Sequence, residues 1–354
     1  MQALILAGGE GTRLRPLTTT VPKPVVPLAN RPLISYMIDW LHRHGFDDVV
    51  MSCGFLADGV RAVLGAGDLD GVRVRYVDEP EPLGTAGAVK FAQPLLEERF
   101  AVLNGDVLTD LDISRLREFH EQRGAVATLG LVPVDDPSSY GVVVTDDGGR
   151  VEDFVEKPAP GTAPTNHISA GMYILEQEVL DRVDAGRAVS FEREVFPSLV
   201  GAGLHAVALE GYWLDIGTPD RYLEATRDIL RGAVETPVMP SEGVKGAAPP
   251  VLAGAACEIA PDAVVGPDVT LGDRCRIGAG AEVSASALHD GVVVEEHAVV
   301  RDSIVGAGAR IGAAARLEGE TIVGEAAVVP PGAHLTGGRL PPDAASGRAR
   351  IRSG

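Results

Sequence analysis

The fold of the N-terminal region is decided by one stretch, Leu6-Ala7-Gly8-Gly9-Glu10-Gly11-Thr12-Arg13-Leu14-Arg15-Pro16-Leu17-Thr18, which continues to Pro22-Lys23-Pro24. The apolar run Ala3–Leu6 predicts a buried first strand, and the glycines mark its turn. Glycines let a backbone approach a ligand closely and direct several N–H groups at an anion. Arg13, Arg15 and Lys23 add positive charge nearby. The combination is typical of a polyphosphate site.

Two common phosphate loops do not fit this stretch. A P-loop needs Gly-Lys-Ser/Thr at its end, and the sequence contains no such tripeptide. A dinucleotide-binding fingerprint needs glycine or alanine where Leu14 stands. The alternative interpretation is a tight strand-to-helix turn with arginines exposed to solvent. The basic residues and the Pro22-Lys23-Pro24 tripeptide favour the phosphate site.

Composition limits the class of protein. The 354-residue chain carries a net charge of −19, which argues against a broad nucleic-acid or membrane surface, so we expect neither partner. The cysteines lie far apart, without metal or disulfide spacing, and favour a reducing cytoplasmic location: Cys53, Cys257 and Cys275. The apolar start Met1–Ala7 has no basic leader and is expected to be a strand rather than a signal peptide.

The chain is predicted to have two folded parts. In residues 1–232, strand-like and helix-like segments alternate, which predicts an α/β domain with a mainly parallel sheet. Residues 233–250 are rich in Pro, Gly and Ala and are predicted to be a linker. Residues 251–338 are predicted to form a repeat domain, and 339–354 a flexible tail. The expected strands are Ala3–Leu6, Val49–Ser52, Val72–Val77, Phe100–Asn104, Val126–Val132, Gly141–Thr145, Ile168–Leu175 and His205–Leu209. The expected helices are Pro32–His44, Gly84–Glu97 and Pro219–Arg231.

Apolar residues recur every six positions in the C-terminal part. The repeat runs Ile259, Val265, Leu271, Ile277 and Val283, then Val293, Val299, Val305, Ile311, Leu317, Val323, Val329 and Leu335. Neither helices nor open sheets give a period of six, whereas a parallel β-helix does. This hexapeptide pattern predicts a left-handed parallel β-helix. Its phase slips between Val283 and Val293, so a distorted coil or loop is expected near Ser286–Val292.

The stretch Leu6–Pro24 resembles the signature of the sugar-1-phosphate nucleotidyltransferases, or nucleotide-sugar pyrophosphorylases, most closely their mannose-1-phosphate guanylyltransferase branch. The resemblance implies a Rossmann-like catalytic domain that joins an NTP to a sugar 1-phosphate and releases pyrophosphate. It assigns nucleotide binding to Leu6, Ala7, Gly8, Gly9, Gly11, Thr12 and Arg13. Arg13 and Lys23 would stabilise the leaving pyrophosphate.

Two aspartates could hold the divalent cation that nucleotidyl transfer requires. Asp106 follows a predicted strand at the edge where α/β folds bind ligands. Asp215 lies in Trp213-Leu214-Asp215-Ile216-Gly217. The family pattern, rather than their spacing, joins the two at a Mg²⁺ site, with Mn²⁺ as a substitute. A turn carboxylate and a capping residue are the alternatives.

The sugar phosphate is assigned by resemblance to a further group of residues. Lys157 would hold the phosphate and Glu156 the sugar hydroxyls, while Gly141 and the segment Ser169–Gly171 would contact the sugar ring. The guanylyltransferase branch usually has asparagine where this chain has Ser169. Serine is shorter and has one fewer donor, which leaves room for a sugar other than mannose or for a sugar-like cyclitol phosphate.

Base recognition is expected in Glu81-Pro82-Leu83-Gly84-Thr85-Ala86-Gly87. The Glu81 carboxylate could accept hydrogen bonds from N1 and N2 of guanine, a donor pair that adenine lacks. GTP is therefore favoured, with Gly84 and Thr85 beside the base. The alternative is an acidic residue favoured by a helix N-terminus.

Three other functions remain open. A glucose-1-phosphate thymidylyl- or uridylyltransferase differs only in base and sugar. A non-catalytic regulatory subunit would be expected to lack some of five residues that are all present: Arg13, Lys23, Asp106, Lys157 and Asp215. An acyltransferase would use a histidine of the repeat region, but His289, His297 and His334 are expected to be solvated. A homo-oligomer is expected, because β-helices often associate side by side.

Overall fold

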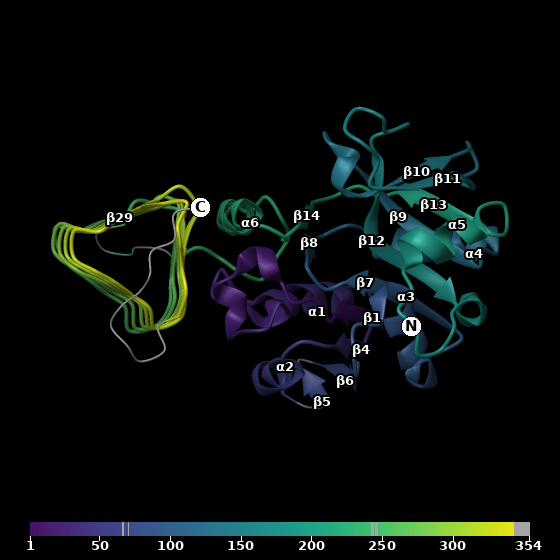
Figure 1. The fold of residues 1–354 in the computed structure, drawn as a ribbon, viewed down its shortest axis with the longest axis horizontal. Coiled ribbons are helices and arrows are strands. Elements are labelled where there is room, and N and C mark those ends of the chain that lie inside the picture. The colour runs from purple at the N-terminus through teal and green to yellow at the C-terminus, as the bar shows by residue number, and fades with distance from the viewer. Residues whose placement is uncertain (66, 70, 242–243, 245–246, 343–354) are drawn as a thin grey trace. The chain divides into compact units, whose positions relative to one another are not determined.

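The computed structural model describes residues 1–65, 67–69, 71–241, 244 and 247–342 (Figure 1). It divides into two compact units, each described by itself. The first consists of Met1–Gly9 and Met37–Trp213, and the second of Glu10–Tyr36 and the chain from Leu214 onward. The N-terminal segment Glu10–Tyr36 therefore groups with the C-terminal repeats. Part of the expected linker and the expected tail from residue 343 onward lie outside the described residues.

The first unit is built on one ten-stranded sheet. Its centre is parallel, in the order β7-β1-β4-β6, and strands β12, β10 and β11 extend it in antiparallel fashion beyond β7. The strands are β1 (Gln2–Ala7), β4 (Asp48–Cys53), β5 (Gly67–Leu69), β6 (Val72–Asp78), β7 (Arg99–Asn104), β9 (Ala127–Pro133), β10 (Gly141–Thr145), β11 (Val151–Glu156), β12 (His167–Glu176) and β13 (Leu204–Ala208). This is the Rossmann-like α/β sheet that the sequence predicts.

Six helices accompany the strands in the described chain. They are α1 (Leu33–Arg43), α2 (Ala57–Leu64), α3 (Gly84–Ala92), α4 (Ile113–Arg123), α5 (Phe196–Leu199) and α6 (Pro219–Arg231). The helix predicted over Gly84–Glu97, with a kink at Pro94, is α-helical only to Ala92, and Gln93–Leu95 forms a 3₁₀ turn because Pro94 does not continue the α-helix. Helix α4 was not predicted, because its exposed face is densely charged, although Asp112 caps it through bonds from the Ser114 and Arg115 N–H groups.

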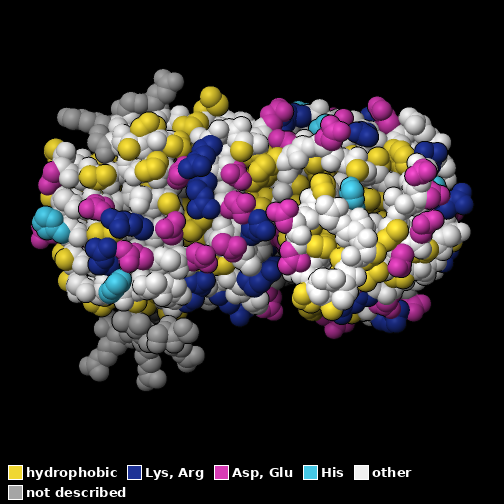
Figure 2. All heavy atoms as spheres, turned by 90° about the horizontal axis from the view of Figure 1, so that it is seen from above, with side chains coloured by type: hydrophobic (Ala, Val, Ile, Leu, Met, Phe, Trp, Pro, Cys, Tyr) yellow, Lys and Arg dark blue, Asp and Glu magenta, His cyan; other side chains and the backbone are white. Residues whose placement is uncertain are grey.

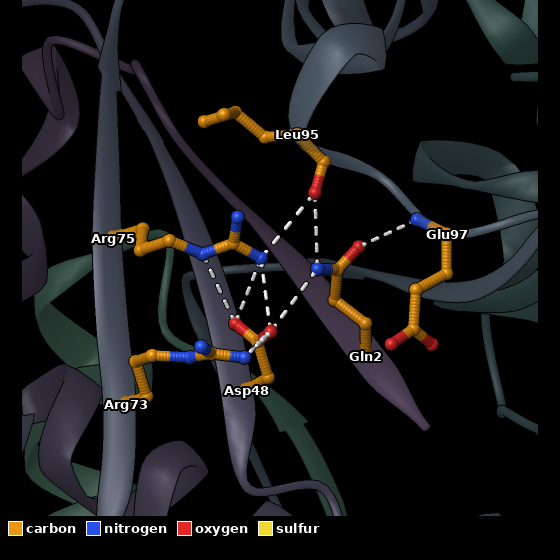
Figure 3. A network of polar contacts seen from close by, with 6 residues as sticks. All are labelled: Gln2, Asp48, Arg73, Arg75, Leu95 and Glu97. Carbon is orange, nitrogen blue, oxygen red and sulfur yellow. Dashed lines mark hydrogen bonds and ion pairs between the residues drawn. The ribbon is translucent and has the colours of Figure 1, made fainter.

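Polar contacts tie the first residues of three parallel strands together (Figure 3). Asp48 at the start of β4 accepts hydrogen bonds from Arg73, Arg75 and Gln2. Gln2 also bonds the Leu95 carbonyl and the Glu97 N–H, which anchors the turn after α3. Burial by itself would raise the pKa of Asp48, but the bonds from Arg75, Arg73 and Gln2 lower it below its usual value.

The repeats of the second unit form three parallel sheets that share one apolar interior (Figure 1). This is the arrangement expected of a left-handed β-helix. One wall contains β15 (Val251–Ala253), β18 (Val269–Leu271), β21 (Ala287–Leu288), β24 (Ser303–Val305), β27 (Thr321–Val323) and β30 (Arg339–Leu340). The second contains β16 (Glu258–Ile259), β19 (Arg276–Ile277), β22 (Val293–Val294), β25 (Arg310–Ile311) and β28 (Val328–Val329). The third contains β17 (Val264–Val265), β20 (Glu282–Ser284), β23 (Val299–Arg301), β26 (Arg316–Glu318) and β29 (His334–Thr336).

At the predicted phase slip of the repeat, the chain forms a corner shortened by one residue in place of a loop. Leu288 follows Val283 in the interior after five residues instead of six, and β21 continues the first wall. The interior residues after the slip are therefore Val294 and Val300, so the assignment of Val293 and Val299 to the repeat was wrong by one position. A strand also forms at Arg339–Leu340, which had been placed in the tail.

Side-chain types are mixed on the face drawn in Figure 2. Basic and acidic side chains lie interspersed there, with no continuous field of either sign. The described part of the chain contains no helix both long and apolar enough to cross a membrane.

Candidate functional site

The first unit gathers most of the predicted residues at one edge of its sheet. Strands β1 and β7 are parallel, with Leu6 opposite Asn104, so both strands end at this edge. The Gly105 N–H donates to the Leu6 carbonyl at 2.9 Å, and a Cβ on Gly105 would lie 2.8 Å from that oxygen. The turn that carries Asp106 therefore lies directly against the end of β1.

The two glycines after β1 have different surroundings. A Cβ on Gly8 would come 2.9 Å from the Glu79 carboxylate, and one on Gly54 would come 3.0 Å from the Gly8 carbonyl. A side chain at position 8 would therefore have to displace the Glu79 carboxylate. A Cβ on Gly9 would meet nothing within 4 Å, so local packing does not explain this glycine.

Glu79, which was not singled out by sequence, lies against the glycine turn that follows β1. Its carboxylate accepts from the Ser52 hydroxyl at 2.9 Å and from the Leu83 N–H at 3.3 Å. Burial raises its pKa, and these two hydrogen bonds oppose that rise. Glu79 thus links the ends of β4 and β6 to the start of α3. Its place two residues after a predicted strand was the available signal.

The segment Ser169–Gly171 meets the same edge from β12. Gly171 has φ +70°, and a Cβ there would come 2.5 Å from the side-chain nitrogen of Asn104. Val142 pairs with Ile168 in antiparallel fashion, which makes Gly141 and Ser169 neighbours at the strand ends. The Ala170 carbonyl accepts from the Trp213 indole at 2.8 Å, and Tyr140 packs edge-on against Trp213. Asn104 and the two aromatic residues were not singled out by sequence.

The Glu156–Lys157 pair follows on the neighbouring strand β11. Glu156 lies opposite Gly141, and a Cβ on Gly141 would come 3.1 Å from its carboxylate. Burial raises the pKa of Glu156, with Glu192 adding to the rise and Lys157 and Arg193 opposing it. Lys157 has φ 49°, an unusual value for a residue with a side chain, and its ammonium lies 3.9 Å from the Glu156 carboxylate.

The predicted base-recognition segment is held by a second strip of chain. Thr85 donates from its hydroxyl to Glu192 at 2.8 Å and accepts from the Phe191 N–H at 2.9 Å. A Cβ on Gly84 would lie 2.7 Å from the Val189 carbonyl, so this glycine has a packing role. Glu81 is exposed at the edge of the segment.

The strip Ser190–Pro197 combines a turn of π-helix with buried aromatic side chains. Residues Phe191–Val195 form one turn of π-helix, with the Ser190 side chain accepting from the Arg193 N–H. Phe191 and Phe196 are buried beside Tyr173. Turns of π-helix are frequent at functional sites.

The remaining predicted residues lie in the second unit. Gly11 has φ +61°, and a Cβ there would come 3.0 Å from Lys23 and from Thr18. Lys23 is only 8% exposed, whereas Thr12 and Arg13 are exposed. The Thr18 hydroxyl donates to the Gly11 carbonyl at 2.7 Å. The segment Gly11–Lys23 is therefore folded back on itself, and the Lys23 side chain packs against Gly11.

Asp215 and Arg13 come together at Gly217. A Cβ on Gly217 would lie 2.9 Å from the Arg13 guanidinium carbon and 3.1 Å from the Asp215 carboxylate. Asp106 belongs to the other unit. No cluster of three or more His, Cys, Asp or Glu side chains suited to a metal occurs among the residues with described positions. A magnesium site made of two aspartates together with phosphate oxygens has too few of these side chains to count as such a cluster.

The prediction that His289 is a solvated surface residue was wrong. It is buried, and its ring nitrogen Nε2 lies 3.1 Å from the hydroxyl of Tyr222. The other two histidines of the repeat region, His297 and His334, are exposed. The His334 ring lies 3.3 Å from the Glu318 carboxylate.

The chain is similar to known proteins over most of its length. The family model described as "Nucleotidyl transferase" matches residues 2–232, and that of the "GMPPB C-terminal domain" matches residues 247–344. A mannose-1-phosphate guanylyltransferase of Mycobacterium tuberculosis is 38% identical over 243 residues, covering 68% of this chain and 67% of that protein. A UTP–glucose-1-phosphate uridylyltransferase of Synechocystis is 37% identical over 261 residues, covering 69% and 67%.

Among solved structures, HddC from Yersinia pseudotuberculosis complexed with GMP-PN is similar to this chain. The two share 31% identity with a TM-score of 0.55, over 63% of this chain and 97% of that chain. The first family model spans more than half of the sequence, so the chain belongs to the nucleotidyl transferase family. The matches cover about two thirds of the length of the two curated relatives.

Proposed function

We propose that this member of the nucleotidyl transferase family joins a nucleoside triphosphate, preferably GTP, to a sugar 1-phosphate and releases pyrophosphate. The observation that carries the proposal is the meeting of three elements at one sheet edge: the turn at Gly8–Gly9, the turn bearing Asp106, and Gly171. These elements come from distant parts of the sequence, and ligands of α/β folds bind at this edge.

The reaction we propose is a single displacement. An oxygen of the sugar phosphate attacks the α-phosphorus of the triphosphate, and a new P–O bond forms as the bond to the bridging oxygen breaks. Pyrophosphate leaves with the electron pair of that bond. No covalent intermediate with the protein is needed, because the nucleophile is already an anion. Lys157 would hold this anion, and Arg13 and Lys23 would stabilise the charge on the leaving group.

Asp106 and Asp215 are the residues that would hold Mg²⁺, or Mn²⁺ in its place. The donor set fits, since Mg²⁺ binds through one or two carboxylates together with phosphate oxygens. When bound, the cation would neutralise phosphate charge and align the reacting groups. Arg13 beside Asp215 offers a second positive charge at the same carboxylate.

The choice of base and sugar is part of the proposal. An exposed Glu81 carboxylate can accept from N1 and N2 of guanine. Mannose 1-phosphate is the acceptor suggested by the Mycobacterium relative, and Ser169 leaves space for a cyclitol 1-phosphate. A uridylyl- or thymidylyltransferase acting on glucose 1-phosphate is the second candidate, because the Synechocystis relative is nearly as similar.

The test is a matrix of substrates. Five NTPs are combined with a panel of sugar and cyclitol 1-phosphates, and pyrophosphate release is measured with Mg²⁺, with Mn²⁺ and with EDTA. We expect release to be fastest with GTP and to stop in EDTA. GTP ranking no higher than UTP or dTTP would refute the base assignment. Release from no combination, with NDP-sugar binding retained, would favour a regulatory subunit.

We further propose that the protein works in the cytoplasm as a homo-oligomer without nucleic-acid or membrane partners. The net charge of −19 supports the last point. Sedimentation of the intact chain measures the oligomeric state.

A further inference from the structure

Over its four central strands, β18, β21, β24 and β27, the first wall of the β-helix is buried on both of its faces. Its interior residues include Leu271, Leu288, Val305 and Val323. The residues that alternate with them point outward, and they are stacked in register from coil to coil. They form one column, Thr270, Ala287, Ile304 and Ile322, and none is more than 2% exposed. We call this column the covered wall.

The outward columns of the other two walls are different. On the second wall the column is Glu258, Arg276, Val293, Arg310 and Val328, and on the third it is Val264, Glu282, Val299, Arg316 and His334. Most of these residues are exposed, and charged side chains pair across the coils, as Arg301 does with Glu282. Only the covered wall is fully buried, and three of its four side chains are apolar, so it is the wall suited to a permanent contact.

Helix α6 and the segment Glu10–Tyr36 make that contact, within the same unit. Helix α6 packs on β24, and Arg231 at its last turn forms two hydrogen bonds, of 3.0 and 2.7 Å, to the buried carboxylate of Asp268. From the N-terminal segment, the Asn30 side chain donates to the Leu271 carbonyl at 2.7 Å. Thr20 donates to Glu325 at 2.8 Å.

The centre of the contact is a buried chain of three groups. The Tyr222 hydroxyl of α6 donates to the Pro27 carbonyl of β2 (Pro27–Leu28). His289 lies on the other side, with Nε2 3.1 Å from the same hydroxyl. Burial lowers the pKa of His289 to about 4, so its ring is neutral near pH 7. A neutral ring protonated at Nε2 donates to the Tyr222 oxygen, so both groups are satisfied.

Tyr222 lies between two parts of the candidate site. Pro27 follows Lys23 through a 3₁₀ turn, in which the Val26 N–H donates to the Lys23 carbonyl. On the other side, the Tyr222 N–H donates to the Thr218 carbonyl at the start of α6, directly after Asp215 and Gly217. Gly217 in turn lies against Arg13. Tyr222 is therefore connected to Lys23 through its side-chain hydroxyl, and to Asp215 and Arg13 through its backbone N–H.

We infer that Tyr222 and His289 are positioning residues, through which the β-helix holds the segment Gly11–Lys23 in the shape that binds the triphosphate and its pyrophosphate leaving group. The inference rests on the proposed function. It gives the β-helix an indirect part in nucleotide binding, exerted through the position of this segment. The proposed sugar phosphate residues belong to the other unit, so the inference predicts no direct effect on them.

The test is Tyr222→Phe, which keeps the ring and removes the hydroxyl. Its matched control is Tyr76→Phe, because the Tyr76 hydroxyl also donates to a carbonyl, that of Gly65, in the first unit. Loss of one hydrogen bond corresponds to about a three- to tenfold change in an equilibrium constant. We expect the KM for the NTP and the inhibition constant of pyrophosphate to rise by about that factor in Tyr222→Phe. The KM for the sugar phosphate should stay within about twofold, and the control should change none of the three.

A second readout does not need catalysis. Amide hydrogen exchange of the peptide 14–30 should become about three- to tenfold faster in Tyr222→Phe and in His289→Phe, and adding the second substitution to the first should add little. His334→Phe, on an exposed wall, should leave this peptide unchanged. Unchanged exchange in Tyr222→Phe would overturn the inference, as would an equal rise in KM for both substrates. If the protein transfers no nucleotide at all, the proposed function fails, and the exchange rates still decide whether β-helix and segment are coupled.

Discussion

Gly171 lies so close to Asn104 that a Cβ at position 171 would come within 2.5 Å of the asparagine side-chain nitrogen. The glycine also has φ +70°, so two independent features exclude a larger residue. Asn104 precedes the turn that carries Asp106, and Ser169 and Ala170 precede Gly171. The contact thus sets the distance between the proposed sugar segment and the proposed metal carboxylate.

Gly171→Ala should therefore lower both stability and activity. We expect the free energy of unfolding to fall by about 1–3 kcal/mol, since backbone strain and a steric contact add. The KM for the sugar phosphate should rise as the segment moves. Gly161→Ala is the matched control, because Gly161 has φ +75° and a Cβ there meets nothing within 4 Å. Equal losses of stability in the two variants, measured by denaturant unfolding, would show that the Asn104 contact has no effect.

Asp106→Asn and Asp215→Asn test the metal proposal. Each substitution keeps the size of the side chain and removes a negative charge, so pyrophosphate release should fall by about a hundredfold or more. Thermal unfolding should change little. Asp58→Asn, at a fully exposed surface carboxylate, should keep normal turnover. Near-normal turnover in either site variant would refute the metal role of that residue.

Much of the sheet edge could be predicted from sequence, for a physical reason. Buried parallel strands are continuous apolar runs, and the glycines and carboxylates that follow them mark the edge where ligands bind. Leu6–Gly9 and Asp106 were found in this way. The β-helix was found because neither α-helices nor open sheets produce an apolar period of six.

The contacts that assemble the site could not be predicted in this way. Asn104 and Glu79 act through neighbours that are distant in sequence, and a single sequence contains no record of such pairs. His289 resembled any surface histidine, because its burial depends on α6 and β2 covering one wall of the β-helix. The error of one position at Val293 has a similar origin. A corner shortened by one residue keeps the strands regular, although the apolar period in the sequence is interrupted.

Glu81→Gln tests the recognition of the base. A carboxylate can accept from both guanine donors, whereas an amide has one acceptor and presents an N–H group to the other donor. The KM for GTP should rise about tenfold, since hydrogen bonds to charged groups are the stronger ones, and the KM for UTP should change little. Glu210→Gln, at another exposed glutamate, serves as the control. An equal change for GTP and UTP would assign Glu81 to a general electrostatic role.

Asp48→Asn tests the network in Figure 3. The Asp48 side chain is 15% exposed and pairs with Arg73 and Arg75, so its loss should cost about 1–3 kcal/mol of stability at pH 7. Its pKa is lowered in the folded state, so the stabilisation is present above the unfolded pKa, about 3.9, and is lost as the pH falls through the folded value. Urea unfolding at a series of pH values should show the two proteins converging below about pH 4. A difference that does not depend on pH would exclude the charge of Asp48 as its cause.

Ser169→Asn tests whether this position selects the sugar. Asparagine restores the residue usual in the guanylyltransferase branch, with a longer side chain and one more donor. If mannose 1-phosphate is a poor acceptor because of Ser169, kcat/KM for it should rise by about three- to tenfold, the effect of one hydrogen bond. The preferred acceptor of the natural protein should lose activity in the same variant, since the added atoms occupy the space it uses. Ser169→Ala is the companion variant, and it should reduce activity with the preferred acceptor without improving mannose 1-phosphate. If asparagine lowers kcat/KM for every acceptor in the panel, position 169 does not select the sugar, and the choice must be made elsewhere around Gly141 and Glu156.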